Sequence, residues 1–150
     1  METPNFDRIN PIECVNGKVK RLHRTVDALY QSVLKPFGLK GSMLSMLFVI
    51  GKRNGINQKQ VAVQLVLDQS TVSRNLKKFE QKGWLEVKKG DDPRSSTLHL
   101  TEEGYALLEE VVPLWEEVHN KVTKQLGEFN IQQLDLTLAA LKGGLTIKFK

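Results

Sequence analysis

Apolar residues in the first part of the chain recur at alternating spacings of three and four, the period of one face of an α-helix. The pattern predicts a helix that begins at Asn10-Pro11, because asparagine caps helices and proline fits the first helical position. Pro36 and Gly38 are expected to end it. Its apolar stripe consists of Ile12, Val15, Val19, Leu22, Val26, Leu29 and Val33. Residues 42–52 are apolar on nearly every side and predict a second, buried helix.

Two short helices are predicted in the middle of the chain. Asn57, with Gln60 three residues later, forms a capping-box pattern that opens the first of them. Asp68 is expected to cap the second, which runs over about residues 69–82 and ends at Gly83. Two short helices joined by a tight connection are typical of a helix-turn-helix.

A two-stranded hairpin follows these helices. Residues 84–88 and 96–100 have strand character, and residues 89–95 between them are rich in turn formers. Thr101 is then expected to cap a long fifth helix, which Pro113 is expected to kink. The hairpin after a helix-turn-helix predicts a winged helix-turn-helix.

The last predicted helix resembles the first in its apolar pattern. Asn130 is expected to cap it, and its seam consists of Ile131, Leu134, Leu138, Leu141 and Leu145. Seams of this spacing at both ends of the chain favour a helical interface shared between two copies. A larger monomeric helical core is the alternative.

The net charge of +5 is unevenly distributed. Residues 1–50 contribute +3, residues 51–100 contribute +5, and residues 101–150 contribute −3. A basic middle section indicates a surface that binds a polyanion. Chance asymmetry of a solvated surface is the alternative interpretation.

The helix over residues 69–82 carries one basic face. Val72, Leu76 and Phe79 fall together on a helical wheel and are expected to face the core. The opposite side lacks acids and carries Ser70, Thr71, Ser73, Arg74, Lys77 and Lys78. Hydroxyl groups can approach base edges, arginine can form two hydrogen bonds with guanine, and lysines suit phosphates. An ordinary solvated face would mix charges of both signs, so the pattern favours double-stranded DNA as the partner.

The tip of the hairpin offers a second candidate DNA contact. Pro93 restricts the backbone, and Asp92 can hold the guanidinium of Arg94 in a forked pair. A projecting arginine suits a narrow minor groove, whereas the alternative is a weak surface salt bridge. Asn57 and Gln58 open a helix and are candidates for phosphate contact, with plain capping as the alternative.

Composition and motifs exclude several classes of protein. A single cysteine rules out an internal disulfide, no signal peptide is recognisable, and the longest strongly apolar run, Met43–Ile50, is too short to span a bilayer. We therefore expect a soluble, cytoplasmic protein without a membrane partner. The histidines are scattered, and no metal-ligand spacing, phosphate loop or nucleophile elbow occurs. We predict neither an enzyme nor a bound metal or cofactor.

The run from Gln60 to Gly104 resembles the MarR family of bacterial regulators. Its marks are the helix that begins near Asp68, the motif at Glu80–Leu85, the Asp-x-Arg wing at Asp92–Arg94 and the motif at Leu100–Gly104. The resemblance implies a homodimer formed by the terminal helices, which binds a palindromic operator, usually as a repressor. It also implies release from DNA by a small phenolic or lipophilic effector, or by oxidation of a cysteine.

The sequence leaves the trigger open. Cys14 suggests a redox-responsive regulator, because some relatives sense peroxides with a cysteine in the first helix. Aligning Arg24 and Tyr30 with the similar residues of those sensors, however, puts Gly17 at the sensing position. Arg21 is close enough along the helix to lower the pKa of the Cys14 thiol. A thiol without a sensing role is the alternative.

Four residues are candidates for an effector pocket, because methionine and aromatic side chains form adaptable apolar walls. They are His23, Met43, Met46 and Trp115. Ordinary core packing is the alternative for each of them.

The sequence thus predicts one domain over residues 1–150, mainly α with a small β-hairpin wing. Residues 39–100 would form the winged-helix DNA-binding lobe, and residues 1–38 and 101–150 the dimerisation helices. The expected function is that of a sequence-specific transcriptional regulator. A winged-helix module that binds protein is the other reading, and it would need neither the basic face nor the wing arginine.

Overall fold

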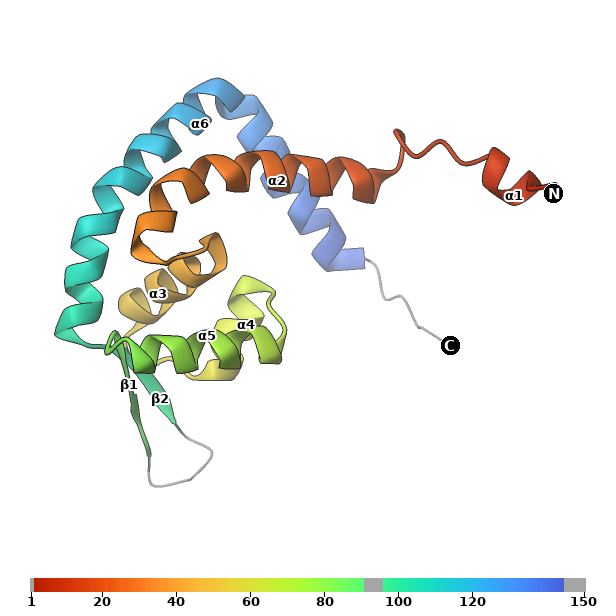
Figure 1. Cartoon of the computed structure of the whole chain (residues 1–150). Coiled ribbons are helices and arrows are strands. Elements are labelled where there is room, and N and C mark those ends of the chain that lie inside the picture. Colours follow the sequence, from red (N-terminus) through yellow and green to blue (C-terminus); the bar gives the residue numbers. More distant parts are fainter. Residues whose placement is uncertain (1, 91–95, 145–150) are drawn as a thin grey trace. The chain divides into compact units, whose positions relative to one another are not determined.

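The computed structural model describes residues 2–90 and 96–144. These residues form two compact units, which divide between Trp115 and Glu116. The first unit contains a series of helices, a hairpin and the beginning of the last helix (Figure 1). The elements are α1 (Pro4–Asp7), α2 (Val15–Leu34), a 3-10 helix (Lys35–Phe37), α3 (Gly41–Arg53), α4 (Gln58–Leu65), α5 (Gln69–Gln81), β1 (Leu85–Lys88), β2 (Thr97–Leu100) and α6 (Glu102–Gly144). Their order confirms the predicted winged helix-turn-helix.

The start of the first long helix was predicted wrongly. The side chain of Asn10 accepts a hydrogen bond from the backbone N–H of Ile12 at 3.1 Å and so forms a local turn in place of a helix cap. Helix α2 begins at Val15 instead, after Cys14, which has a non-helical ψ of 117°. The predicted end is confirmed, since Gly38 adopts a positive φ of 68° directly after the 3-10 helix.

The core of the first unit surrounds α3. The buried residues of this helix are Met43, Leu44, Met46, Leu47, Val49 and Ile50. They form one apolar cluster with buried side chains from the surrounding elements, including Leu34, Val61, Phe79, Leu98 and Val111. The cluster confirms the expectation of a buried second helix.

The hairpin is joined to the helices through its second strand. β1 and β2 are antiparallel, with Leu85 opposite Leu100 and Lys88 opposite Thr97. On the other side of β2, the backbone of Leu98 donates to the carbonyl oxygen of Ile56 at 2.8 Å, in the connection between α3 and α4. β2 therefore lies between β1 and this connection, which gives the hairpin a fixed base.

Helix α6 begins against the start of β1. The hydroxyl of Thr101 accepts from the backbone N–H of Gly104 at 3.0 Å and donates to the carbonyl oxygen of Gly83, so the predicted cap is confirmed. A Cβ atom on Gly104 would lie 2.2 Å from the carbonyl oxygen of Trp84. The glycine is thus required by a close approach of two backbone segments.

The predicted break between the last two helices is confirmed, and it falls three residues before the expected cap at Asn130. The helix includes Pro113, and its non-helical residue is Gly127, with φ 76° and ψ 157°. Glycine adopts this conformation readily. Asn130 does not cap a helix, because it lies within α6 and its side-chain amide donates to the carbonyl oxygen of Leu126 at 2.7 Å.

Two properties of the described residues bear on the class of protein. No single helix among them has the length and apolar character needed to cross a membrane, whereas the bent pair Val15–Phe37 and Gly41–Arg53, at 74°, meets that test jointly. No group of three or more His, Cys, Asp or Glu side chains within the described part of the chain is arranged to hold a metal ion.

Candidate nucleic-acid interface and effector pocket

The local sequence fixes the turn between α4 and α5. Asn57 and Gln60 form the predicted capping box, with Asn57 accepting from the backbone of Gln60 at 2.9 Å and donating to its side chain at 3.0 Å. Helix α4 ends at Val66, which adopts the left-handed conformation with φ 53°. The following N–H, of Leu67, donates to the carbonyl oxygen of Ala62 at 3.0 Å. The chain is thereby turned into α5 without a glycine.

Asp68 organises the first turn of α5. Its carboxylate accepts from the backbone N–H of Thr71 at 2.7 Å, from the Thr71 hydroxyl at 2.6 Å and from the Ser70 hydroxyl. These hydrogen bonds hold the pKa of Asp68 well below its usual range. The predicted cap is confirmed. The hydroxyl groups of Ser70 and Thr71 donate to Asp68, so their oxygens can act toward other groups only as acceptors.

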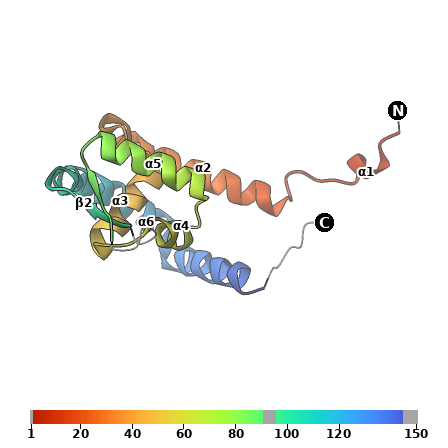
Figure 2. The same cartoon turned by 90° about the horizontal axis from the view of Figure 1, so that it is seen from below.

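One side of α5 is exposed and basic. Helix α5 itself lies on the side of the first unit from which the hairpin projects (Figures 1 and 2). Arg74, Lys77 and Lys78 are exposed, and neither lysine forms an ion pair with a described residue. Arg74 bends back along the helix, where its side chain donates to the carbonyl oxygen of Ser70 at 3.3 Å and to the hydroxyl of Thr71 at 3.4 Å. Ser73, also predicted on this face, is half-buried.

The other side of α5 packs into the core. Val72, Leu76 and Phe79 are buried, as predicted. Asn75 is buried with them, 8% exposed, and its amide donates to the sulfur of Met46 at 3.6 Å. Sequence reasoning missed Asn75, because a polar residue gives no hydrophobic signal. Its position directly before Leu76 was the available clue.

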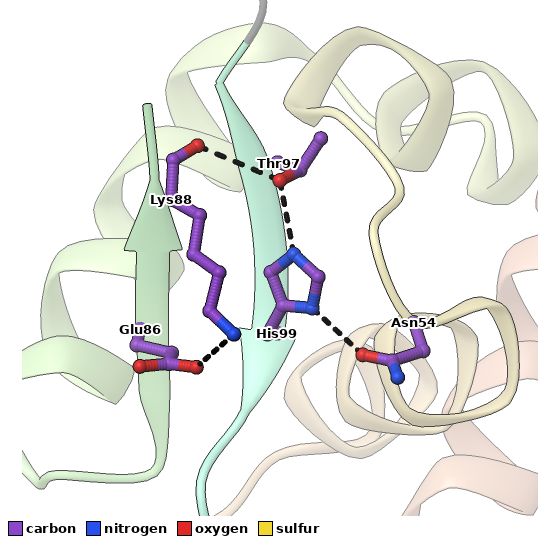
Figure 3. A network of polar contacts seen from close by, with 5 residues as sticks. All are labelled: Asn54, Glu86, Lys88, Thr97 and His99. Atoms are coloured by element: carbon purple, nitrogen blue, oxygen red, sulfur yellow. Dashed lines mark hydrogen bonds and ion pairs between the residues drawn. The ribbon is translucent and has the colours of Figure 1, made fainter. Parts of the chain in front are cut away.

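A chain of polar contacts supports the base of the hairpin (Figure 3). The ring of His99 on β2 hydrogen-bonds with Asn54 at 2.7 Å through Nδ1 and with Thr97 at 2.9 Å through Nε2. The Thr97 hydroxyl lies 3.5 Å from the carbonyl oxygen of Lys88, whose ammonium group is 2.9 Å from the carboxylate of Glu86. These contacts connect the C-terminus of α3 to both strands. None of them was predicted.

The remaining predicted DNA contacts have different positions. Asp92 and Arg94 lie outside the described residues. Asn57 is occupied as a cap, and the side chain of Gln58 donates to that of Gln69 at 3.4 Å, so Gln58 connects the starts of α4 and α5.

Cys14 is exposed and directly precedes α2. Arg21, the basic residue predicted to act on its thiol, donates to the carbonyl oxygen of Ile12 at 3.4 Å. This bond holds the guanidinium near the turn before α2.

A pocket of about 390 Å³ lies between α2, α3 and the start of α6. Its lining residues are His23, Val26, Asp27, Tyr30, Leu34, Gly41, Ser42, Leu44, Ser45, Phe48 and Trp115. The Trp115 ring lies 5.5 Å from Phe48, edge to face, and 6.1 Å from Tyr30 between centroids. Burial raises the pKa of Tyr30, so its phenol is neutral at physiological pH.

The pocket brings together two of the four predicted effector residues. His23 and Trp115 line it, whereas Met43 and Met46 are buried in the core cluster. Met43 also lines a smaller pocket of about 250 Å³ between α3 and α5, next to Arg74. Sequence reasoning missed the other lining residues. Of these, Val26 belongs to the apolar stripe of α2 that was read as a dimer seam, whereas Asp27 lies next to that stripe along the chain.

Comparison with known proteins identifies the family. The MarR family model matches residues 37–94. The transcriptional regulator PecS of Dickeya dadantii is 30% identical over 115 residues, which cover 74% of this chain and 68% of PecS. Across three curated HTH-type regulators that match, the alignments span 57% to 78% of the relatives' lengths.

Solved structures agree with this result. The Mycobacterium tuberculosis regulator MosR, solved in complex with DNA, has a TM-score of 0.74 at 29% identity, covering 89% of this chain and 100% of MosR. NadR in complex with 4-hydroxyphenylacetate shares the fold, with a TM-score of 0.71 at 19% identity over 86% of this chain and 95% of NadR. The relatives are DNA-binding regulators and not enzymes. The chain therefore belongs to the MarR family of winged helix-turn-helix transcriptional regulators.

Proposed function

We propose that the protein is a cytoplasmic homodimeric repressor that binds a palindromic operator and leaves it when a small effector enters the pocket at α2 and α3. The observation that carries the proposal is the exposed face of α5, on which the basic side chains of Arg74, Lys77 and Lys78 lie together with the hydroxyl of Ser70. Such a face suits the major groove. In this proposal residues 39–100 act as the DNA-binding lobe.

The proposed DNA contacts divide by chemistry. Ser70, Thr71 and Ser73 would approach base edges, with Arg74 released from Ser70 to reach a guanine. The lysines would neutralise phosphates. Arg94, held by Asp92 at the wing, would enter the minor groove. Asn57 and Gln58, at the start of α4, would lie near the phosphate backbone of the DNA.

A second copy of the chain is the proposed partner of the terminal helices. On α2 the predicted seam leaves large apolar side chains exposed, among them Val15 at 75%, Val19 at 54% and Leu29 at 47%. In the second unit the exposed leucines are Leu134, Leu136, Leu138 and Leu141. Apolar surface of this extent on two helices favours burial in a symmetric interface. A dimer would also present two α5 helices to one palindrome.

The trigger we favour is a small molecule, because the pocket falls in the range of 300–1,000 Å³ typical of ligand sites and has aromatic walls. NadR, solved with a phenolic acid, supplies a precedent within this fold. Oxidation of Cys14 is the second candidate, and the exposure of its thiol favours it. The alternative function is that of a winged-helix module that binds another protein and does not bind DNA.

The experiment compares Arg74→Ala with Arg8→Ala, which removes an exposed arginine far along the chain from α5. Operator affinity is measured by fluorescence anisotropy at several salt concentrations. Arg74→Ala should cost about 1–3 kcal/mol of binding free energy and relax specificity at one base step. Arg8→Ala should bind as the wild type does. Equal DNA affinity of the two variants would show that Arg74 on α5 does not contact the DNA.

A further inference from the structure

An aromatic acid needs a positive charge in its binding pocket, whereas this pocket carries a negative one. Among its described lining residues, Asp27 is the carboxylate and no lysine or arginine occurs. We propose that this pocket selects a flat aromatic molecule bearing an amine, and rejects aromatic carboxylates. The inference rests on the effector pocket of the proposed function and names the chemistry of its ligand.

The first step is the depth at which Asp27 lies. His23, Asp27, Tyr30 and Leu34 follow one another at spacings of four, three and four, so they share one face of α2. His23 is exposed, Asp27 and Tyr30 are half-buried, and Leu34 is 1% exposed. The face therefore runs from the mouth of the pocket to its floor. Asp27 lies one turn inside the mouth, where partial desolvation strengthens its electrostatic interactions.

The second step is the position of the carboxylate against α3. A Cβ atom on Gly41 would lie 2.9 Å from Oδ1 of Asp27. Gly41 is the first residue of α3, and the residue before it provides no side-chain cap. Positive potential at a helix N-terminus is where an incoming carboxylate would be stabilised. Here the carboxylate of Asp27 lies beside the N-terminus of α3. It would repel a carboxylate on the ligand and attract an ammonium group.

The third step is the aromatic wall. Tyr30, Phe48 and Trp115 form a contiguous set of rings. Ring faces attract cations in addition to packing against flat molecules, so the wall and Asp27 favour the same sign of ligand charge. The described lining has three titratable side chains, His23, Asp27 and Tyr30. Of these, His23 is exposed, at the mouth of the pocket. A proton on this ring would oppose a cationic ligand, so the test is made at pH 8.

The test uses two probes with the same ring and opposite charges. Tyramine and 4-hydroxyphenylacetate both carry a 4-hydroxyphenyl group, and one ends in an ammonium, the other in a carboxylate. Isothermal titration calorimetry on the full chain should give a Kd for tyramine at least about tenfold lower than that for the acid. Asp27→Asn should bring the two values within about threefold. Glu13→Gln, which removes an exposed carboxylate before α2, should retain the preference.

A second variant moves the carboxylate without removing it. Gly41→Ala places a methyl group 2.9 Å from Oδ1 of Asp27, which is too close, so the carboxylate must shift away. Tyramine should then bind several-fold more weakly at unchanged net charge. Equal or tighter binding of the acid by the wild type overturns the proposal, and so does binding of neither probe.

DNA affinity measured on the same preparations separates this proposal from the one on which it rests. Intact DNA binding without any response to tyramine means that the ligand chemistry is wrong and the regulator stands. Selective tyramine binding in a protein that does not bind DNA means that the ligand chemistry is right and the proposed regulator function is wrong. Release of DNA by tyramine, abolished in Asp27→Asn, supports both.

Discussion

At the scale of single residues, Asp68 connects the folding of α5 with the chemistry of its exposed face. The carboxylate gathers three donors from Ser70 and Thr71, which are lost when the chain unfolds. Its pKa is therefore lowered in the folded state relative to the ordinary value of 3.8. A carboxyl group with a lowered folded pKa contributes stability that is fully present above the unfolded pKa and is lost as the pH falls.

Replacement of Asp68 should show this dependence. At pH 7, Asp68→Ala should lower the Tm by roughly 2–4 °C, because an N-cap and a favourable helix-dipole interaction are lost. The Tm difference from the wild type should narrow progressively as the pH falls below 3.8. Melting followed by circular dichroism between pH 7 and 2.5 measures it. A difference that stays constant over this range would contradict the account.

Gly104 is the second residue whose identity the structure requires. Gly104→Ala places a Cβ atom 2.2 Å from the carbonyl oxygen of Trp84 and forces α6 away from the start of β1. The free energy of unfolding should fall by about 2 kcal/mol in urea titrations. Gly17→Ala is the matched control, because the nearest atom lies 3.7 Å from its Cβ and alanine favours a helix. Equal effects of the two substitutions would show that the close approach is unimportant.

At the scale of elements, the turn between α4 and α5 is the strained part of the helix-turn-helix. Val66 is β-branched, 74% exposed and in the left-handed region at φ 53°. A side chain of this shape costs about 1–2 kcal/mol there, and its exposure means that little burial offsets the cost.

Val66→Gly should therefore stabilise the protein by about 1 kcal/mol, after allowance for the greater entropy of glycine in the unfolded chain. Urea denaturation measures the change. As a control, Val63→Gly places glycine inside α4, at another exposed valine, and should be destabilising. A loss of stability with Val66→Gly would mean that the valine side chain has a packing role.

Local signals explain which elements could be predicted. The caps at Asn57, Asp68 and Thr101 and the core face of α5 follow from neighbouring residues, and the structure confirms them. The start of α2 failed because Asn10 has two local options, a cap or a turn, with the same hydrogen-bond donors nearby. The break in α6 falls at Gly127, close to the predicted boundary at Asn130, because glycine readily adopts the positive φ found there.

Features that depend on the tertiary fold were not predictable. Asn75 is buried because of where α3 lies, and the contacts of His99 with Asn54 join residues 45 positions apart. The pocket likewise needs α2, α3 and Trp115 together. Periodicity identified the face of α2 that carries Val26, but it could not separate pocket residues from interface residues.

At the scale of the whole molecule, the exposed apolar side chains of α2 and of the second unit support the proposed dimer. Leu138→Lys should dissociate it, because a charge at a 57% exposed seam position does not disturb the fold of one chain but opposes its burial between two. Analytical ultracentrifugation should show a monomer. Val63→Lys, at a 70% exposed valine of α4, should remain dimeric. If the Leu138→Lys variant stays dimeric, this seam is not part of the dimer interface.

The central claim is that two copies of α5 read one DNA site. Selection of bound sequences from a random duplex pool at physiological salt tests it most directly. The account predicts recovery of a palindrome whose half-sites lie about 10 base pairs apart, with affinity that falls steeply as salt rises because phosphate contacts release counterions. Failure to enrich any sequence, with or without tyramine present, would contradict it.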